Sequence, residues 1–89
     1  ETRFDVDESR KFIIIDEVKE RLNKEEKKII DIDGVRVEDE DGWFLMRASN
    51  TQNQLTCRAE SISEEGLRKL IAIIENQLSL SGVNYKFMI

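Results

Sequence analysis

Two closely spaced Asp-Gly pairs constrain the fold of this chain more than any other feature of its sequence. Asp33-Gly34 follows the apolar run of residues 28–33, and Asp41-Gly42 precedes the apolar run of residues 43–47. Because glycine adopts positive φ without strain, Asp-Gly between hydrophobic runs predicts a tight turn that joins antiparallel strands. We therefore predict strands at 28–33, 35–38 and 43–47, connected by two hairpin turns.

Alternation of apolar and polar residues predicts further strands. Phe4 and Val6 alternate with polar neighbours, which is typical of a short half-buried strand. Residues 55–60 alternate in the same way, and Cys57 falls on their inward face, where we expect an inert small hydrophobic side chain. The tail Val83–Ile89 alternates too, which predicts either a last short strand or an arm that docks elsewhere.

Two amphipathic helices complete the pattern. The first is predicted from about residue 7 to 23, with Asp7 as its N-cap. Its apolar stripe comprises Phe12, Ile14, Ile15, Val18 and Leu22. The second is predicted to begin at Ser61 or Ser63 and to stop at Gly82. Its apolar stripe comprises Leu67, Leu70, Ile71, Ile74 and Leu78.

A meander and two such helices bury their apolar surfaces together only when both helices pack on the sheet. We therefore predict an α+β fold, a two-layer sandwich in which an antiparallel sheet of about four strands carries two helices on one face. The length of 89 residues suits a single domain, 1–89. The chain begins at Glu1 rather than Met, which suggests a piece of a longer protein.

Charge and composition exclude several classes of function. The formal net charge of −5 argues against a nucleic-acid partner and against an anionic membrane surface, and no apolar run is long enough to span a bilayer. The chain has no His, so zinc sites and Ser-His-Asp or Cys-His nucleophiles are not expected. A lone cysteine forms no internal disulfide, which favours a cytoplasmic protein.

The polar segment after the strand at 43–47 offers the best candidate site. It supplies the guanidinium of Arg47, the hydroxyls of Ser49 and Thr51, and the amide of Asn50. Arginine presents a planar fork of donors that matches phosphate oxygens, and the N–H groups of a loop can form an anion-binding concavity. None of these groups is a general base at neutral pH, so the segment suits holding an anion rather than acting on it. By composition alone, it is more simply a polar connection between two strands.

The run from Asp33 to Thr51 resembles the last domain of the α-D-phosphohexomutases. In that family a DG(V/I)(K/R) strand leads into a G-W-x-x-x-R-(A/P)-S-(N/G)-T-x-P-x-L loop. Leu55 fits the leucine of this loop, and Arg58 and Glu60 fit the strand after it. The resemblance covers about residues 4–78 and implies a TATA-box-binding-protein-like sandwich. It also implies that four residues bind the substrate phosphate that is not being transferred: Arg47, Ser49, Asn50 and Thr51.

For the whole enzyme, the resemblance implies interconversion of hexose 1-phosphate and hexose 6-phosphate with Mg²⁺ bound outside this domain. The phosphoserine segment, the metal loop and the sugar-recognition loop of the family are absent here, so we expect no catalytic residue and no activity from these 89 residues alone. The expected partners are a hexose phosphate and the other domains of the same chain. Asn50 favours the phosphomannomutase/phosphoglucomutase branch over the phosphoglucosamine branch. Gln52 and Asn53 depart from the family's loop, which usually has proline there, and predict a less rigid loop.

Four alternatives remain at this stage. Asp31 and Asp33 in a hydrophobic strand followed by Gly34 resemble the first motif of haloacid-dehalogenase-type phosphatases, which need a parallel sheet and a longer chain. The acidic turn 39–41, with those aspartates, resembles a calcium site but lacks the spacing of an EF-hand. Trp43 with Phe44 suggests a sugar-stacking platform, although strand aromatics usually belong to the core. Lastly, an adaptor module could share this architecture and use its sheet edge and tail as the interface.

Overall fold

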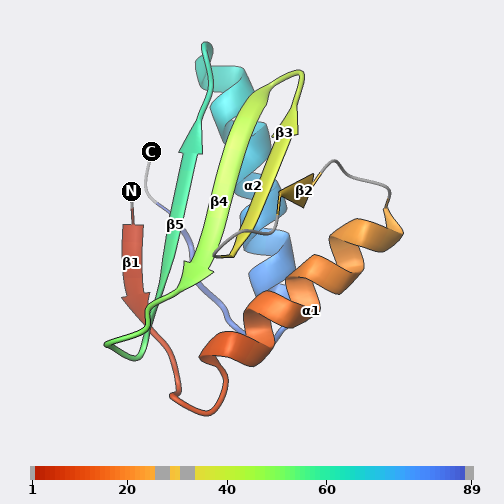
Figure 1. Ribbon diagram of the computed structural model, residues 1–89. Coiled ribbons are helices and arrows are strands. Elements are labelled where there is room, and N and C mark those ends of the chain that lie inside the picture. The colour runs from red at the N-terminus through yellow and green to blue at the C-terminus, as the bar shows by residue number, and fades with distance from the viewer. Residues whose placement is uncertain (1, 26–28, 31–33, 88–89) are drawn as a thin grey trace.

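The computed structural model describes residues 2–25, 29–30 and 34–87, which form one sheet and two helices (Figure 1). The elements in chain order are β1 (Thr2–Asp5), α1 (Lys11–Lys24), β2 (Ile29–Ile30), β3 (Val35–Asp39), β4 (Gly42–Ala48), β5 (Gln54–Glu60) and α2 (Glu64–Leu80). Within the described ranges, neither helix is long and apolar enough to cross a membrane.

The sheet has the order β1-β5-β4-β3-β2, and every neighbouring pair is antiparallel. Both helices contact β4; in Figure 1, α2 lies behind the strands, and α1 crosses in front of the lower part of α2 to the right of the strands. No described helix covers the face of β3, β4 and β5 that is turned to the viewer in Figure 1, here called the open face. The prediction of an α+β two-layer sandwich is therefore confirmed. The described sheet has five strands, whereas a sheet of about four was expected. Its two edge strands are β1 and the two-residue β2. An all-antiparallel sheet also contradicts the dehalogenase alternative, and Asp31 and Asp33 themselves lie outside the described residues.

The second Asp-Gly pair forms the predicted hairpin between β3 and β4. Asp39 pairs with Gly42, and the amide N–H of Asp41 donates to Asp39 Oδ1 at 2.8 Å, so this carboxylate closes the turn. Gly42 has φ 141°, and a Cβ there would collide with the carbonyl oxygen of Glu60 on β5. The site therefore requires glycine for both its conformation and its close packing. The turn at Asp33 lies outside the described residues.

The core lies between the helices and the sheet. Its buried apolar side chains are Phe4, Ile14, Ile15, Val18, Leu22, Val35, Val37, Phe44, Met46, Leu55, Cys57, Leu70, Ile74 and Leu78. Cys57 is in this cluster as predicted, and burial raises the pKa of its thiol to about 12. Phe12 was wrongly placed in the apolar stripe, because it is 52% exposed. It points about a quarter turn away from the line of Ile15 and Leu22, since each helical residue advances by about 100°.

The start of α1 also differs from the prediction. The helix begins at Lys11, and Asp7 caps the preceding turn instead of the helix. The backbone N–H and hydroxyl of Ser9 both donate to Asp7 Oδ1, at 3.0 and 2.9 Å, and these bonds lower the pKa of the Asp7 carboxyl. Asp and Ser favour such local bonds over helix, so the chain turns once before the helix starts.

The second helix follows the prediction closely. Ser63 is the N-cap, and its hydroxyl oxygen accepts from the N–H of Gly66 at 2.9 Å. Gly82 has φ 85° and ends the helix, with the N–H of Val83 donating to the carbonyl of Leu78. Its stripe is buried at Leu70, Ile74 and Leu78 and partly buried at Leu67 and Ile71.

Hydrogen bonds from two arginines join the two helices at the edge of the core. Arg21 of α1 donates to the side-chain oxygen of Gln77 at 2.7 Å, to the carbonyl of Gln77 at 3.0 Å and to the hydroxyl of Ser81 at 2.6 Å. Arg10 donates to the carbonyl of Ser81 at 3.0 Å. Gln77 and Ser81 are buried, so these charge-assisted bonds satisfy groups that would otherwise be costly to desolvate.

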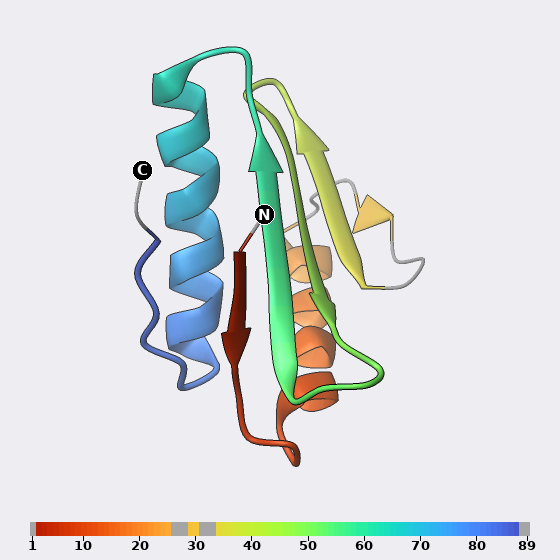
Figure 2. The same ribbon diagram turned by 90° about the vertical axis from the view of Figure 1, so that its left-hand side faces the viewer.

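Of the two alternatives for the tail, a last strand or a docking arm, residues 83–87 form the arm, and it docks against its own domain. The arm runs back along α2 (Figure 2), and the N–H of Phe87 donates to Glu75 Oε2 at 2.8 Å. Tyr85 stacks on Phe4 of β1 with ring centroids 4.3 Å apart, and Phe87 meets both rings edge-on. The alternation therefore marks which arm residues face the core.

We expect replacement of Tyr85 with alanine to lower the free energy of unfolding by about 2 kcal/mol, because it removes a half-buried ring and its stack on Phe4. Urea denaturation followed by circular dichroism measures this loss. Asn84→Ala changes the exposed neighbouring residue and is expected to have almost no effect. Equal midpoints for both variants would show that the arm does not contribute to stability.

Candidate phosphate-binding site

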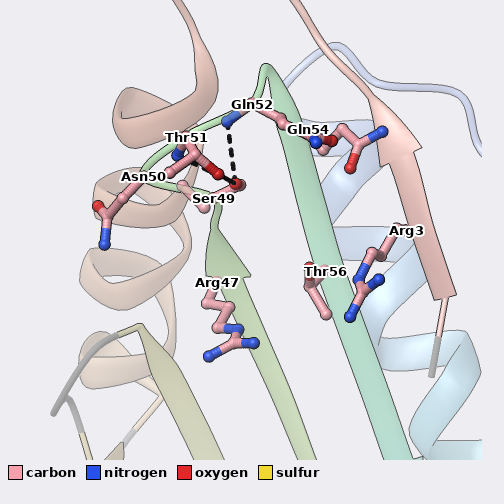
Figure 3. Close-up of a pocket in the computed structure, with 9 residues that line it drawn as sticks. Arg3, Arg47, Ser49, Asn50, Thr51, Gln52, Gln54 and Thr56 are labelled. Carbon is pink, nitrogen blue, oxygen red and sulfur yellow. Dashed lines mark hydrogen bonds between the residues drawn. The ribbon is translucent and has the colours of Figure 1, made fainter.

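The candidate loop joins the end of β4 to the start of β5 at one end of the sheet. The N–H of Ser49 donates to the carbonyl of Gln54 at 2.9 Å, which brings the two ends of the loop together. Ser49 Oγ then accepts from the N–H groups of Thr51 and Gln52, at 3.3 and 3.1 Å, as the dashed line to Gln52 shows in Figure 3. Ser49 Oγ also lies 3.5 Å from the hydroxyl oxygen of Thr51, within hydrogen-bond distance, so the two loop hydroxyls lie side by side.

Two contacts from the amino-terminal part of the chain support this loop. Lys11 Nζ donates to the carbonyl of Gln52 at 2.9 Å, and the N–H of Val6 donates to the carbonyl of Asn53 at 2.9 Å. Lys11 is buried, with 7% of its surface exposed, so its ammonium is held where it meets the loop. The loop therefore has anchors at both of the positions where the sequence departs from the family pattern.

Sequence reasoning missed Lys11. A signal was present, because Lys11 precedes Ile15, Val18 and Leu22 on the same helical face, at spacings of four, seven and eleven. A cation in line with an apolar stripe must find a hydrogen-bond acceptor in or beside the core. The carbonyl of Gln52 is that acceptor.

We expect Lys11→Met to loosen the loop without unfolding the chain, because methionine keeps an apolar stem but cannot donate to Gln52. In ¹⁵N relaxation measurements, the order parameters of residues 50–53 should fall from about 0.85 to below about 0.6. Lys24→Met removes the same charge from the exposed end of α1 and serves as the control. Unchanged order parameters in Lys11→Met would contradict an anchoring role.

The loop and the adjoining strands line a hollow of about 390 Å³ on the open face of the sheet (Figure 3). Its lining residues are Arg3, Arg47, Ala48, Ser49, Asn50, Thr51, Gln52, Gln54 and Thr56. They supply two guanidinium groups, three hydroxyls and three amides. No described lining residue is Asp or Glu, although the chain as a whole has a net charge of −5. The hollow thus combines positive charge with hydrogen-bond donors, the chemistry that an anion requires.

All four residues singled out from the sequence line this hollow, but they do not contribute equally. Arg47, Ser49 and Thr51 gather around it, whereas Figure 3 shows the side chain of Asn50 turned to the side of the loop. Asn50 also lines a smaller neighbouring hollow with Phe12 and residues of α1. Its amide is therefore placed between the loop and the helix.

Two further arginines lie on the same face of the sheet, outside the hollow. Arg36 and Arg58 pair with Glu38 and Glu60, at 3.4 and 2.9 Å. Their guanidinium groups also lie over the ring of Trp43, at 4.2 and 5.5 Å from its centroid. The simplest interpretation of the sequence placed both aromatic residues in the core. Phe44 does lie in the core, but Trp43 does not. The described residues contain no group of three His, Cys, Asp or Glu side chains that could hold a metal ion.

Comparison with known proteins identifies the family. Residues 1–77 match the sequence model of a protein family, the C-terminal domain of phosphoglucomutase/phosphomannomutase. The chain belongs to this family.

Curated relatives agree with this family assignment. A phosphomannomutase/phosphoglucomutase of Pseudomonas aeruginosa is 40% identical over 78 residues, which is 88% of this chain and 17% of the relative. A probable phosphoglucosamine mutase of Methanococcoides burtonii is 40% identical over 70 residues, 79% of this chain and 16% of the relative. A phosphoglucomutase of Neisseria meningitidis is 40% identical over 72 residues, 75% of this chain and 16% of the relative. The chain thus spans about a sixth of the length of these mutases.

Proposed function

We propose that this chain is the phosphate-binding, C-terminal domain of a cytoplasmic phosphohexomutase that interconverts hexose 1-phosphate and hexose 6-phosphate. Membership in the family and relatives named as mutases support this function. The observation that carries it is the hollow in which Arg47 and the loop hydroxyls meet with no described carboxylate in the lining. Such a set of donors suits a phosphate monoester, which has about −1.5 to −2 charge and three acceptor oxygens at pH 7.

The role proposed for the domain is to orient the substrate. The Arg47 guanidinium would form two parallel bonds to one phosphate, and the Ser49 and Thr51 hydroxyls would bond its remaining oxygens. Holding the non-reacting phosphate fixes the sugar relative to the other domains, where the phosphoryl group is transferred. Phosphoryl transfer needs a metal ion, and we propose that Mg²⁺ binds to the rest of the enzyme, outside this domain.

Phosphoglucosamine mutase is the second candidate. The relative from Methanococcoides burtonii favours it, since its identity to this chain equals that of the Pseudomonas aeruginosa mutase. Asn50 in the loop supports the phosphomannomutase/phosphoglucomutase assignment instead. Activity measurements on the protein that carries this domain, with mannose, glucose and glucosamine phosphates in parallel, would decide between the two.

The test of the phosphate site is a titration of the chain with inorganic phosphate and glucose 6-phosphate, followed by ¹H–¹⁵N NMR. We expect saturable shifts in the amides of residues 47–54, with a dissociation constant near the millimolar range, about −4 kcal/mol, because one wall of a cleft binds alone. Chloride at equal ionic strength is the control. An adaptor module predicts no localised shifts, and their absence up to about 100 mM phosphate would contradict our proposal.

A further inference from the structure

Arg3 occupies a position that neither the family motif nor the loop accounts for. It lies on β1, at the amino end of the chain, yet it lines the same hollow as Arg47 and the loop. The register explains this, because Thr56 of β5 pairs with Arg47 on one side and with Arg3 on the other. All three side chains therefore lie in one row on the open face of the sheet.

The geometry of this row suits one anion. Neighbouring strands are about 4.8 Å apart, so the Cα atoms of Arg3 and Arg47 lie about 10 Å apart across β5. Two arginine side chains easily span that distance. Figure 3 shows both guanidinium groups on the same side of the sheet, with Thr56 between them and the loop above. Thr56 is buried beneath them, with 4% of its surface exposed.

We propose that Arg3 is a second phosphate-binding arginine, so that the site holds a doubly charged phosphate monoester between guanidinium groups from β1 and β4. This inference rests on the proposed function and deepens it. One guanidinium cancels only part of the charge of such a group, whose three terminal oxygens accept several donors. A second positive charge in the hollow matters in this chain because its overall charge of −5 repels anions.

The carboxylate that follows Arg3 on this face of β1 lies outside the hollow and has a hydrogen-bond donor on β5. Asp5 is next on the same face of β1, and its Oδ1 accepts from the side-chain amide of Gln54 at 3.1 Å. Gln54 therefore holds this carboxylate at the start of β5, and Asp5 does not line the hollow. Arg58 lies on the same sheet face but does not line the hollow, and it forms an ion pair with Glu60. Replacing Arg58 therefore removes the same charge from this face without removing a side chain that lines the hollow, and it serves as the matched control.

The experiment compares the affinity of the chain and its variants for inorganic phosphate at pH 8, measured by NMR titration. Arg3→Gln is expected to weaken binding about fivefold to tenfold, while Arg58→Gln changes it less than twofold. Arg3→Lys, which keeps the charge but loses the planar fork, should fall between Arg3→Gln and the unsubstituted chain. Arg3 is exposed, so its replacement leaves the core intact, and unchanged ¹H–¹⁵N spectra away from the hollow verify the fold.

The outcomes separate the two proposals. If Arg47→Ala weakens binding and Arg3→Gln does not, the second arginine is overturned while the phosphate site stands. Equal losses in Arg3→Gln and Arg58→Gln also overturn it, because they indicate a general effect of charge. If the unsubstituted chain binds no phosphate, or Arg47→Ala binds as well as it does, the proposed function fails and this inference fails with it.

Discussion

Replacing Arg47 with alanine is expected to weaken phosphate binding about tenfold to a hundredfold while the fold stays intact. Hydrogen bonds to a charged partner contribute about 1.5–3 kcal/mol, and each 1.4 kcal/mol is a factor of ten. Arg47 is half-buried on β4 and is the lining arginine next to the loop hydroxyls, whereas Arg3 lines the hollow from β1 on the far side of β5, so Arg3 does not replace the donors of Arg47. The affinity of the variant for glucose 6-phosphate, measured by NMR titration, checks this loss.

Two further variants make the Arg47 result interpretable. Arg47→Lys keeps a positive charge without the planar fork and should recover only part of the affinity. Arg68→Ala removes an arginine that pairs with Glu64 on the exposed surface of α2, and should bind like the unsubstituted chain. Undiminished binding in a folded Arg47→Ala chain would show that the loop is not the phosphate site, and an adaptor role would then be the better hypothesis.

The second large effect concerns stability. Phe44→Ala is expected to lower the free energy of unfolding by about 3–5 kcal/mol, because it leaves a cavity where a fully buried ring now lies. Phe44 is in β4, between Val37 and Ala59 on the adjacent strands, and faces both helices. Small domains have only about 0.05–0.15 kcal/mol of stability per residue, so this variant should be mostly unfolded at low urea concentrations.

Urea denaturation measured by circular dichroism and fluorescence tests the Phe44 prediction. Leu80→Ala removes a similar apolar side chain from the exposed end of α2 and should cost little. Phe44→Leu, which fills much of the cavity, should fall between the two. A loss below about 1 kcal/mol in Phe44→Ala would mean that the core collapses around the missing ring.

Local periodicity was sufficient to predict much of this fold. The hairpin at Gly42, the strand 55–60 and the helix capped by Ser63 follow from features within a few residues, and the structure confirms them. The errors have nonlocal causes. Phe12 and Trp43 are apolar residues beside the core-facing rows, and only packing decides which neighbours face inward. The arm 83–87 alternates like a strand but packs its rings against Phe4 and α2, so it forms no strand.

Some residues of the candidate site could be predicted from the sequence and others could not. Arg47 and the loop that follows are contiguous in the sequence, so their donor chemistry can be recognised without a structure. Arg3 and Lys11 come from distant parts of the chain, and their places depend on the register of β1 against β5 and on the packing of α1. No local pattern encodes that register. The hollow is therefore more positively charged and more firmly supported than its sequence motif alone indicates.

The pairing of β1 with β5 also has a consequence for folding. Arg3 pairs with Thr56, and α1, β2, β3 and β4 lie between these two residues in the chain. Contacts between such distant residues form slowly, because a long loop must close first. We therefore expect the row of Arg3, Thr56 and Arg47 to form late in folding. Because the proposed site exists only when β1 has paired with β5, phosphate bound there should stabilise the native chain, by about 2.7 kcal/mol at a hundred times its dissociation constant.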